Sequence, residues 1–136
     1  MVDISPQRDL MTSAIKTIKE ITDVPVFVQG REATDKFPII ILSTGGTNPS
    51  NRSKNETRST YTIYVDYFDT VDHQRDGDMM DNCYRIREHL QHLQLSIHNC
   101  RSFNFTQSEM IDNSTSKPLH HVTLVLDYNI TEKSFI

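Results

Sequence analysis

The sequence has few of the residues from which catalytic and redox motifs are built. It contains four glycines, no tryptophan and two cysteines, Cys83 and Cys100. The cysteines form no CxxC pair, so we interpret both as reduced thiols, with Cys83 as a small apolar residue of the core. No GxGxxG or GxxxxGK[ST] phosphate loop occurs, and no GxSxG nucleophile elbow. The sequence therefore predicts no catalytic residue, no cofactor and no enzyme activity.

Long apolar runs and a positive charge balance are also missing. The longest apolar run, Ile39 to Leu42, is about four residues, whereas a membrane-spanning helix needs ~18. The N-terminus has neither the basic nor the apolar region of a secretory signal. The net charge of -4 argues against a protein that binds nucleic acid through bulk charge. These absences predict a reduced, cytosolic setting without membrane contact.

A chain of 136 residues has the size of one domain, 1–136, and can bury roughly two-thirds of its unfolded surface. Its hydrophobic content of 36% is low. Such a chain has either a small core with long solvated loops, or a core that is completed by assembly with copies of itself. The composition leaves both interpretations open.

Two amphipathic helices are predicted from apolar spacing. The first begins at Ser5-Pro6, where serine is a favourable cap and proline fits the first helical position, and ends near Thr22-Asp23. The second spans Met79 to Leu93. Its apolar residues recur at intervals of four and three, which indicates a helix lying on a flat surface: Met79, Cys83, Ile86, Leu90 and Leu93.

Five strands are predicted from apolar runs and alternation. Val24–Val28 contains Pro25 and should lie at the start or border of the sheet, while Phe37–Ser43 is apolar throughout and should be covered on both faces. Tyr61–Phe68, Ser102–Gln107 and Leu119–Ile130 alternate, with Phe103 and Phe105 predicted on one face. The fold class is therefore α+β: a mixed, mainly antiparallel sheet of about five strands with two packed helices, in the order α-β-β-β-α-β-β.

The segment 44–59 is polar and basic, in contrast to the acidic chain as a whole. It is predicted as a long loop, either a solvated hairpin connection or a segment that orders against a partner. Its candidate partner contacts are Asn48, Arg52, Lys54 and Arg58. The predicted flexible tail, 131–136, adds Phe135 and Ile136 as two apolar side chains that could dock on a neighbour.

Neither the acidic residues nor the six histidines match a metal motif. The acids between Asp69 and Asp78 lack the glycine and closing glutamate positions of a calcium loop, and Asp76 or Asp78 fits better as a helix cap. A metal-dependent enzyme using His89, His92, His98 or His120 is a further hypothesis, but its only support is the number of histidines. We expect no bound metal.

The order of the predicted elements resembles that of the tail-terminator proteins of long-tailed bacteriophages, which complete the tail and join it to the head. The residues that carry the resemblance are the first strand with Val24-Pro25-Val26, the second strand, and the third strand ahead of its helix. The last strand also fits the pattern. The resemblance covers about residues 5–131, and the segments that carry it are Val24–Val26, Phe37–Ile41, Ser59–Tyr67, Met80–Leu90 and Leu119–Tyr128.

The resemblance implies a structural protein of the virion tail or neck, assembled in the host cytoplasm. It implies a homo-oligomeric ring, a hexamer in the virion and possibly a monomer in solution. The implied partners are the head connector or stopper protein and the tail-tube protein, with DNA passing through the ring without sequence-specific binding. The family carries no catalytic residues to transfer. The alternative hypothesis is a small non-catalytic ligand-binding or regulatory α+β domain.

Overall fold

The computed structural model describes residues 4–29, 37–52, 56–71, 76–113 and 117–133, and the backbone alone at 46–52, 56–57, 76 and 132–133. Two helices and five strands follow one another in the predicted order. The elements are α1 (Pro6–Ile21), β1 (Val26–Val28), β2 (Ile39–Arg52), β3 (Glu56–Thr70), α2 (Asp76–Gln91), β4 (Asn99–Asp112) and β5 (Leu119–Lys133).

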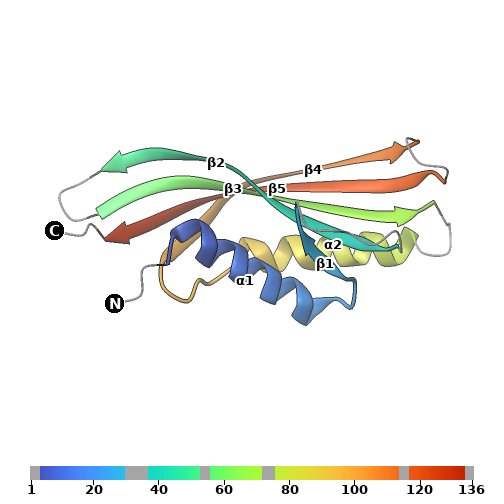
Figure 1. The fold of residues 1–136 in the computed structure, drawn as a ribbon, viewed down its shortest axis with the longest axis horizontal. Helices are drawn as coiled ribbons and strands as arrows, with labels where there is room; N and C mark the ends of the chain where they lie inside the picture. The colour runs from blue at the N-terminus through green and yellow to red at the C-terminus, as the bar shows by residue number, and fades with distance from the viewer. Residues whose placement is uncertain (1–3, 30–36, 53–55, 72–75, 114–116, 134–136) are drawn as a thin grey trace.

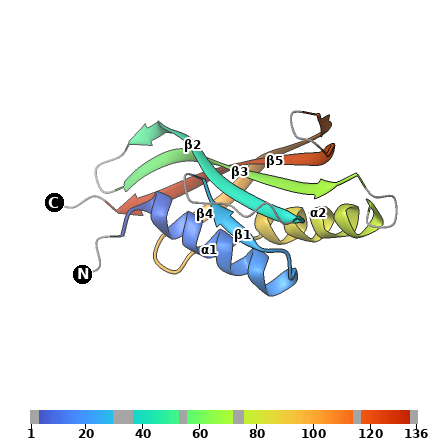
Figure 2. The same cartoon turned by 45° about the vertical axis from the view of Figure 1, so that its right-hand side comes forward.

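The five strands form one twisted sheet in the order β1-β2-β3-β5-β4, and both helices lie on the same face of it (Figures 1 and 2). Only the β1–β2 pair is parallel, and the other three pairs are antiparallel. The predicted α+β class with a mixed, mainly antiparallel sheet is confirmed. β1 lies at an edge of the sheet, where the proline that precedes it interrupts no inner ladder.

Helix α1 begins as its sequence predicts. Ser5 is the N-cap, and its side-chain oxygen accepts a hydrogen bond from the backbone N–H of Arg8. Asp9, in the first turn, is buried, and its carboxylate accepts hydrogen bonds from the backbone N–H groups of Ser96, Ile97 and His98. This carboxylate ties the start of α1 to the segment between α2 and β4, a contact that the sequence pattern did not reveal.

The core lies between the helices and the sheet. The five apolar residues predicted to face the sheet from the second helix are all buried. They meet the buried side chains of the two central strands, Ile63, Val65 and Tyr67 from β3 and Val122, Leu124, Leu126, Tyr128 and Ile130 from β5. The alternation predicted for these two strands is therefore confirmed, and every second residue faces the helices. No helix in the described parts of the chain is long and apolar enough to cross a membrane.

The predicted long loop at 44–59 is wrong. β2 continues through Arg52 and β3 already begins at Glu56, so most of this segment forms the two arms of a hairpin. The arms pair from Thr47 with Tyr61 to Arg52 with Thr57, and β2 has one bulge before Thr47 and a second between Pro49 and Asn51. Beyond Leu42, β1 no longer pairs with β2. Pro49 has no backbone N–H, and it lies in a part of β2 that has no β1 partner to which an N–H would donate.

Two other predicted boundaries also need correction. β5 runs to Lys133, so the residues 131–133 of the predicted tail belong to the sheet. β4 is much longer than predicted, and its register shifts between Ser102 and Asn104. This irregularity takes Phe103 out of the alternation: Phe103 is exposed, whereas Phe105 packs against the core. The two phenylalanines do not share a face in the way the sequence predicts.

Candidate functional site

The face of the sheet opposite the helices is open and carries many polar side chains. Alternation along β2, β3 and β5 puts every second side chain on this open face. All of these side chains are partly exposed: Ile41, Ser43, Thr60, Thr62, Tyr64, Asp66, Phe68, His121, Thr123, Val125, Asp127, Asn129 and Thr131. The alternation predicted for Tyr61–Phe68 thus gives β3 a partly exposed side that carries Tyr64 and Phe68.

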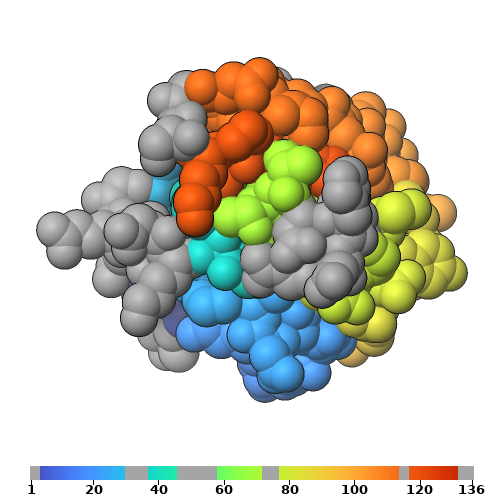
Figure 3. Space-filling model, turned by 90° about the vertical axis from the view of Figure 1, so that its right-hand side faces the viewer, coloured from blue at the N-terminus to red at the C-terminus, as the bar shows by residue number. Residues whose placement is uncertain are grey.

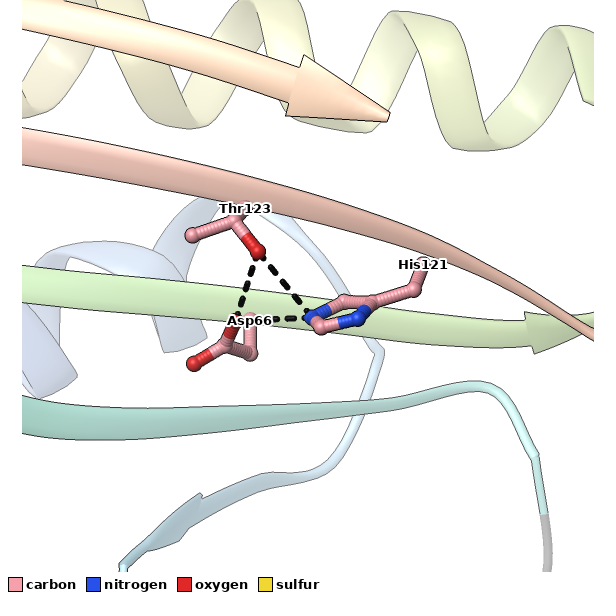
Figure 4. Close-up of polar contacts among 3 residues, drawn as sticks. All are labelled: Asp66, His121 and Thr123. Carbon is pink, nitrogen blue, oxygen red and sulfur yellow. Dashed lines mark hydrogen bonds and ion pairs between the residues drawn. The ribbon is translucent and has the colours of Figure 1, made fainter. Parts of the chain in front are cut away.

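Asp66, His121 and Thr123 form a hydrogen-bonded cluster at one end of the open face (Figure 4). The His121 Nε2 atom is 2.7 Å from Asp66 Oδ1 and 3.1 Å from the Thr123 hydroxyl, which itself donates to Asp66 at 2.8 Å. The His121 ring also stacks on Phe68, with 4.1 Å between ring centroids. The cluster joins β3 to β5 by side chains in addition to the backbone ladder.

This cluster contains the residue types of a nucleophilic triad, but its geometry differs from one. In a triad the carboxylate holds one ring nitrogen while the other nitrogen takes the proton of the hydroxyl. Here both Asp66 and Thr123 contact the same nitrogen of His121, and the hydroxyl donates to the carboxylate. The arrangement is that of a cross-strand polar contact, which fixes side-chain positions.

Further along the open face, polar side chains continue to pair across strands. Thr62 donates to Asp127, and Asn104 donates to the other oxygen of the same carboxylate at 3.3 Å. Thr60 donates to Asn129 at 3.2 Å. Many of the polar groups of this face are therefore already oriented by their neighbours, so the face is a preformed surface with fixed hydrogen-bonding groups.

Tyr64 occupies the middle of the open face because Gly45 leaves room for it. A side-chain carbon built at Gly45 would lie 3.1 Å from the Tyr64 ring and 3.1 Å from Thr62 Cβ. Gly45 falls within the first bulge of β2, between Thr44 and Thr47. The glycine lets the ring lie across the neighbouring strand, as aromatic residues do opposite glycines in sheets.

Of the six predicted partner-contact residues, the structure describes the side chain of one. Arg58 is exposed in β3 and lines a cleft of ≈ 240 Å³ together with Arg101 of β4. Asn48 and Arg52 belong to β2, where the structure describes their backbone but not their side chains. Lys54, Phe135 and Ile136 lie outside the described residues. Sequence reasoning missed Arg101, because only the strand pairing places it beside Arg58.

The histidines considered as metal ligands lie in different surroundings. His89 and His92 are exposed, and the His98 Nε2 atom is 2.9 Å from the backbone oxygen of Ile4. His120 and His121 alternate in β5 and so lie on opposite faces of the sheet. Within the described residues, no group of three His, Cys, Asp or Glu side chains is placed to hold a metal ion.

Both thiols face the core side of the sheet. Burial raises the pKa of Cys83 to about 12 and that of Cys100 to about 11, so neither is a thiolate near neutral pH. The Cys100 Sγ atom donates to the backbone oxygen of Leu93 at 3.2 Å. These groups have the environment of structural cysteines, as predicted for Cys83.

Comparison with known proteins yields a match of structure alone. No protein-family model matches the chain, and no curated protein matches its sequence. A chain in a structure called "Virion of native gene transfer agent (GTA) particle" aligns with 96% of this chain and 100% of its own length, with a TM-score of 0.55 and 8% identity. The shared property is the fold. A second solved structure, whose name states no role, aligns over 97% of this chain and 99% of its own, with a TM-score of 0.50 and 15% identity.

Proposed function

We propose that this chain is a structural virion protein that terminates the tail tube of a phage-like particle and joins it to the head connector. In this proposal six copies form a ring in the tail or neck, and DNA passes through the ring. The observation that carries the proposal is the fold match with a chain of a gene transfer agent virion, which spans almost the whole of both chains. A match of that extent involves the whole domain and not one recurring motif.

The open face supports a position beside passing DNA. Its centre carries the carboxylates of Asp66 and Asp127 among threonine, serine and asparagine side chains. Tight DNA binding requires several cations to neutralise phosphates, and each such contact would hold the DNA in place. This mildly acidic, hydroxyl-rich centre of the face offers DNA few attractive contacts, so it suits a wall along which DNA slides.

The edges of the sheet support assembly with further copies. β1 and β4 each have a neighbouring strand on one side only in the described sheet. β4 also presents Phe103, Met110 and Ile111 as exposed apolar side chains. Exposed strand edges and apolar side chains of this kind are typical of surfaces that are covered by another protein. In the proposed ring they face neighbouring subunits or adjoining rings.

Disrupting the gene in a strain that produces the particles tests the proposal. Electron microscopy should show DNA-filled heads and tail tubes that are not joined, and a plasmid copy of the gene should restore joined particles. Joined, infectious particles in the disrupted strain would contradict the tail-terminator role.

Shortening the β2–β3 hairpin tests whether its tip contacts the adjoining protein. Replacing residues 52–57 by Asn-Gly keeps the pair Asn51–Arg58 and closes it with a two-residue turn that suits antiparallel strands. We expect the thermal midpoint to remain close to that of the unaltered protein while head–tail joining is lost. The matched control, the double substitution Arg52→Lys and Lys54→Arg, keeps the charges and should support joining. Normal joining by the shortened protein would remove the hairpin tip from the interface.

The alternative of a ligand-binding domain has one observation in its favour. A cleft of ≈ 560 Å³ lies between α1 and the strands β1 and β2, within the usual size range of ligand sites. Its lining combines Met11, Ile15 and Val28 with Arg8, Gln29 and Ser43. Native mass spectrometry of protein purified from its own host would detect a retained small molecule. Such a molecule, lost on the substitution Ile15→Arg, would favour this alternative.

A further inference from the structure

A basic cleft lies at the hairpin end of the open face. Arg58 and Arg101 line it together with the polar side chains of Asn99, Asn129 and Thr131. In the sheet, Arg58 is opposite Thr131 and Arg101 is opposite Asn129, so the two arginines flank β5 from its two neighbouring strands. Strand geometry places their Cα atoms roughly 12 Å apart, and both side chains therefore reach the space above β5.

The lining of the basic cleft favours carboxylates. Guanidinium groups bind carboxylates through paired hydrogen bonds, and the amides and hydroxyl beside them can donate further ones. Duplex DNA is a poorer fit, because it needs a longer track of cations than the two arginines of this cleft. Cys100 also lines the cleft, but its thiol donates to the Leu93 backbone oxygen on the core side and adds no negative charge near neutral pH.

An acidic cleft lies between the end of α1 and the start of α2. Glu20, Asp23 and Asp78 line this cleft of ≈ 480 Å³, and all three are exposed. Its one cationic side chain, Arg85, donates a hydrogen bond to the Asn82 side chain. Figure 3 shows the two helices side by side at this end of the molecule, α1 in blue and the start of α2 in yellow-green. The cleft thus presents three carboxylates and one guanidinium.

The two clefts are far apart and cannot meet within one molecule. The basic cleft is near Arg58 in β3, while Pro38 of the acidic cleft directly precedes Ile39, which pairs with Phe68. Arg58 and Phe68 lie roughly 33 Å apart along the strand. The basic cleft also belongs to the open face and the acidic cleft to the helix side. A contact between them therefore joins two different surfaces of two copies, which is the kind of contact that builds rings or filaments.

We propose that the basic cleft of one copy binds the acidic cleft of the next, with Arg58 and Arg101 facing Glu20, Asp23 and Asp78. The charges of the two surfaces are opposite, and each copy carries one of each. This inference rests on the ring in the proposed function and specifies one of its subunit contacts. Charge pairing between exposed groups gives orientation and specificity more than affinity, so the contact sets how neighbours are arranged.

Charge exchange tests this contact in solution. Sedimentation velocity at millimolar protein and low salt should show self-association of the unaltered chain, and added salt should weaken it. The variant Arg58→Asp/Arg101→Asp and the variant Asp23→Arg/Asp78→Arg should each associate at least about tenfold more weakly, because like charges then face each other. An equimolar mixture of the two variants should associate again, since each then supplies the complement of the other.

A control with the same change in net charge as Arg58→Asp/Arg101→Asp separates the contact from general repulsion. Lys16→Asp/Lys19→Asp alters two exposed positions of α1 outside both clefts and should associate as the unaltered protein does. Circular dichroism and thermal unfolding confirm that each variant is folded. The proposal is overturned if the unaltered chain stays monomeric or if the mixture of the two variants does not associate. It is also overturned if the control associates as weakly as the variants do.

The outcomes distinguish this inference from the proposed function. If the variants associate normally while the gene is required for head–tail joining, the proposed function stands and the proposed contact is wrong. If the charge-exchanged variants behave as expected but the chain is dispensable for joining, the proposed contact stands and the proposed function is wrong. The proposal would also be overturned if the basic cleft bound a DNA duplex more strongly than the Asp23/Asp78 surface, and if Arg58→Asp/Arg101→Asp abolished that DNA binding.

Discussion

The two faces of the sheet are built from the same strands and have opposite properties. On β3, Ile63 and Val65 are fully buried beneath the helices, while the alternating residues Thr62 and Tyr64 remain partly exposed. Burial of apolar side chains dominates folding stability, whereas polar cross-strand contacts in water contribute little. The helix face therefore supplies most of the stability, and the open face is left available for recognition. Four measurements test this contrast.

Truncating neighbouring isoleucines on the two faces should produce the largest difference. Ile40 is completely buried in the core cluster, whereas Ile41 lies on the open face and is partly exposed. We expect Ile40→Ala to lower the free energy of unfolding by about 2–5 kcal/mol, because it removes buried methyl groups and leaves a cavity. Ile41→Ala should cost about 1 kcal/mol or less. Urea unfolding measures both, and equal losses would refute the contrast between faces.

Thiol reactivity should report the same contrast. With pKa values of about 12 and about 11, Cys83 and Cys100 are almost entirely protonated at neutral or mildly alkaline pH. Alkylation by iodoacetamide in the folded protein should be on the order of 100-fold slower than for a free thiol, whose pKa is about 8.5. The matched control is Asn104→Cys, at an exposed position of the open face, which should react at close to the rate of a free thiol.

The raised thiol pKa values also set a direction for stability at high pH. The folded chain holds these protons more tightly than the unfolded chain does. Their contribution to stability is therefore complete below the unfolded thiol pKa of about 8.5 and is lost as the pH rises through the folded values of about 11 and about 12. Fast alkylation of both native cysteines would contradict their burial on the helix face of the sheet.

Removing one hydroxyl from each face should give a smaller difference. The buried Tyr128 donates its hydroxyl to the backbone oxygen of Leu90 at 2.7 Å. Tyr128→Phe should cost about 1 kcal/mol, since the carbonyl loses a buried partner. Tyr64→Phe on the open face should leave the free energy of unfolding nearly unchanged, because water can replace the hydroxyl's contacts. Thermal unfolding of the two variants in parallel checks this pair, and a larger effect at Tyr64 would speak against it.

The smallest expected effect is the coupling between Asp66 and His121. Both side chains are about a quarter exposed or less, at 24% and 18%, so solvent screens the pair. A double-mutant cycle with Asp66→Ala and His121→Ala should give a coupling of about 0.5–1 kcal/mol. A coupling of several kcal/mol would mean that the open face contributes to stability as the helix face does.

Local sequence patterns predicted the parts of the fold that local physics decides. The spacing of Met79, Cys83 and Ile86 identified the buried side of α2, and alternation identified the buried sides of β3 and β5. In each case the residue's own hydrophobicity determines the direction of its side chain. The cap at Ser5 was predictable for the same reason, because the cap hydrogen bond forms within one turn of the chain.

The missed features depend on pairing with distant strands. The continuation of β2 through Gly45, Asn48 and Pro49 was predicted as a loop because these residues are poor strand formers. Strand β3 imposes the extended conformation on them by pairing. Likewise, Arg101 and Arg58 share a cleft only because the bulge near Phe103 and the register with β5 bring them together. No local pattern specifies such a register in advance.

The position of β5 has a consequence for how the chain folds. It follows the other strands in sequence, yet it pairs along its whole length with β3 on one side and from Leu119 to Thr131 with β4 on the other. Its ladder with β3 joins residues as distant as Thr70 and Leu119, or Glu56 and Lys133. Ladders between such distant segments form slowly. During synthesis the apolar side of β3 therefore stays uncovered until β5 has been made, so β5 controls when the native sheet can form.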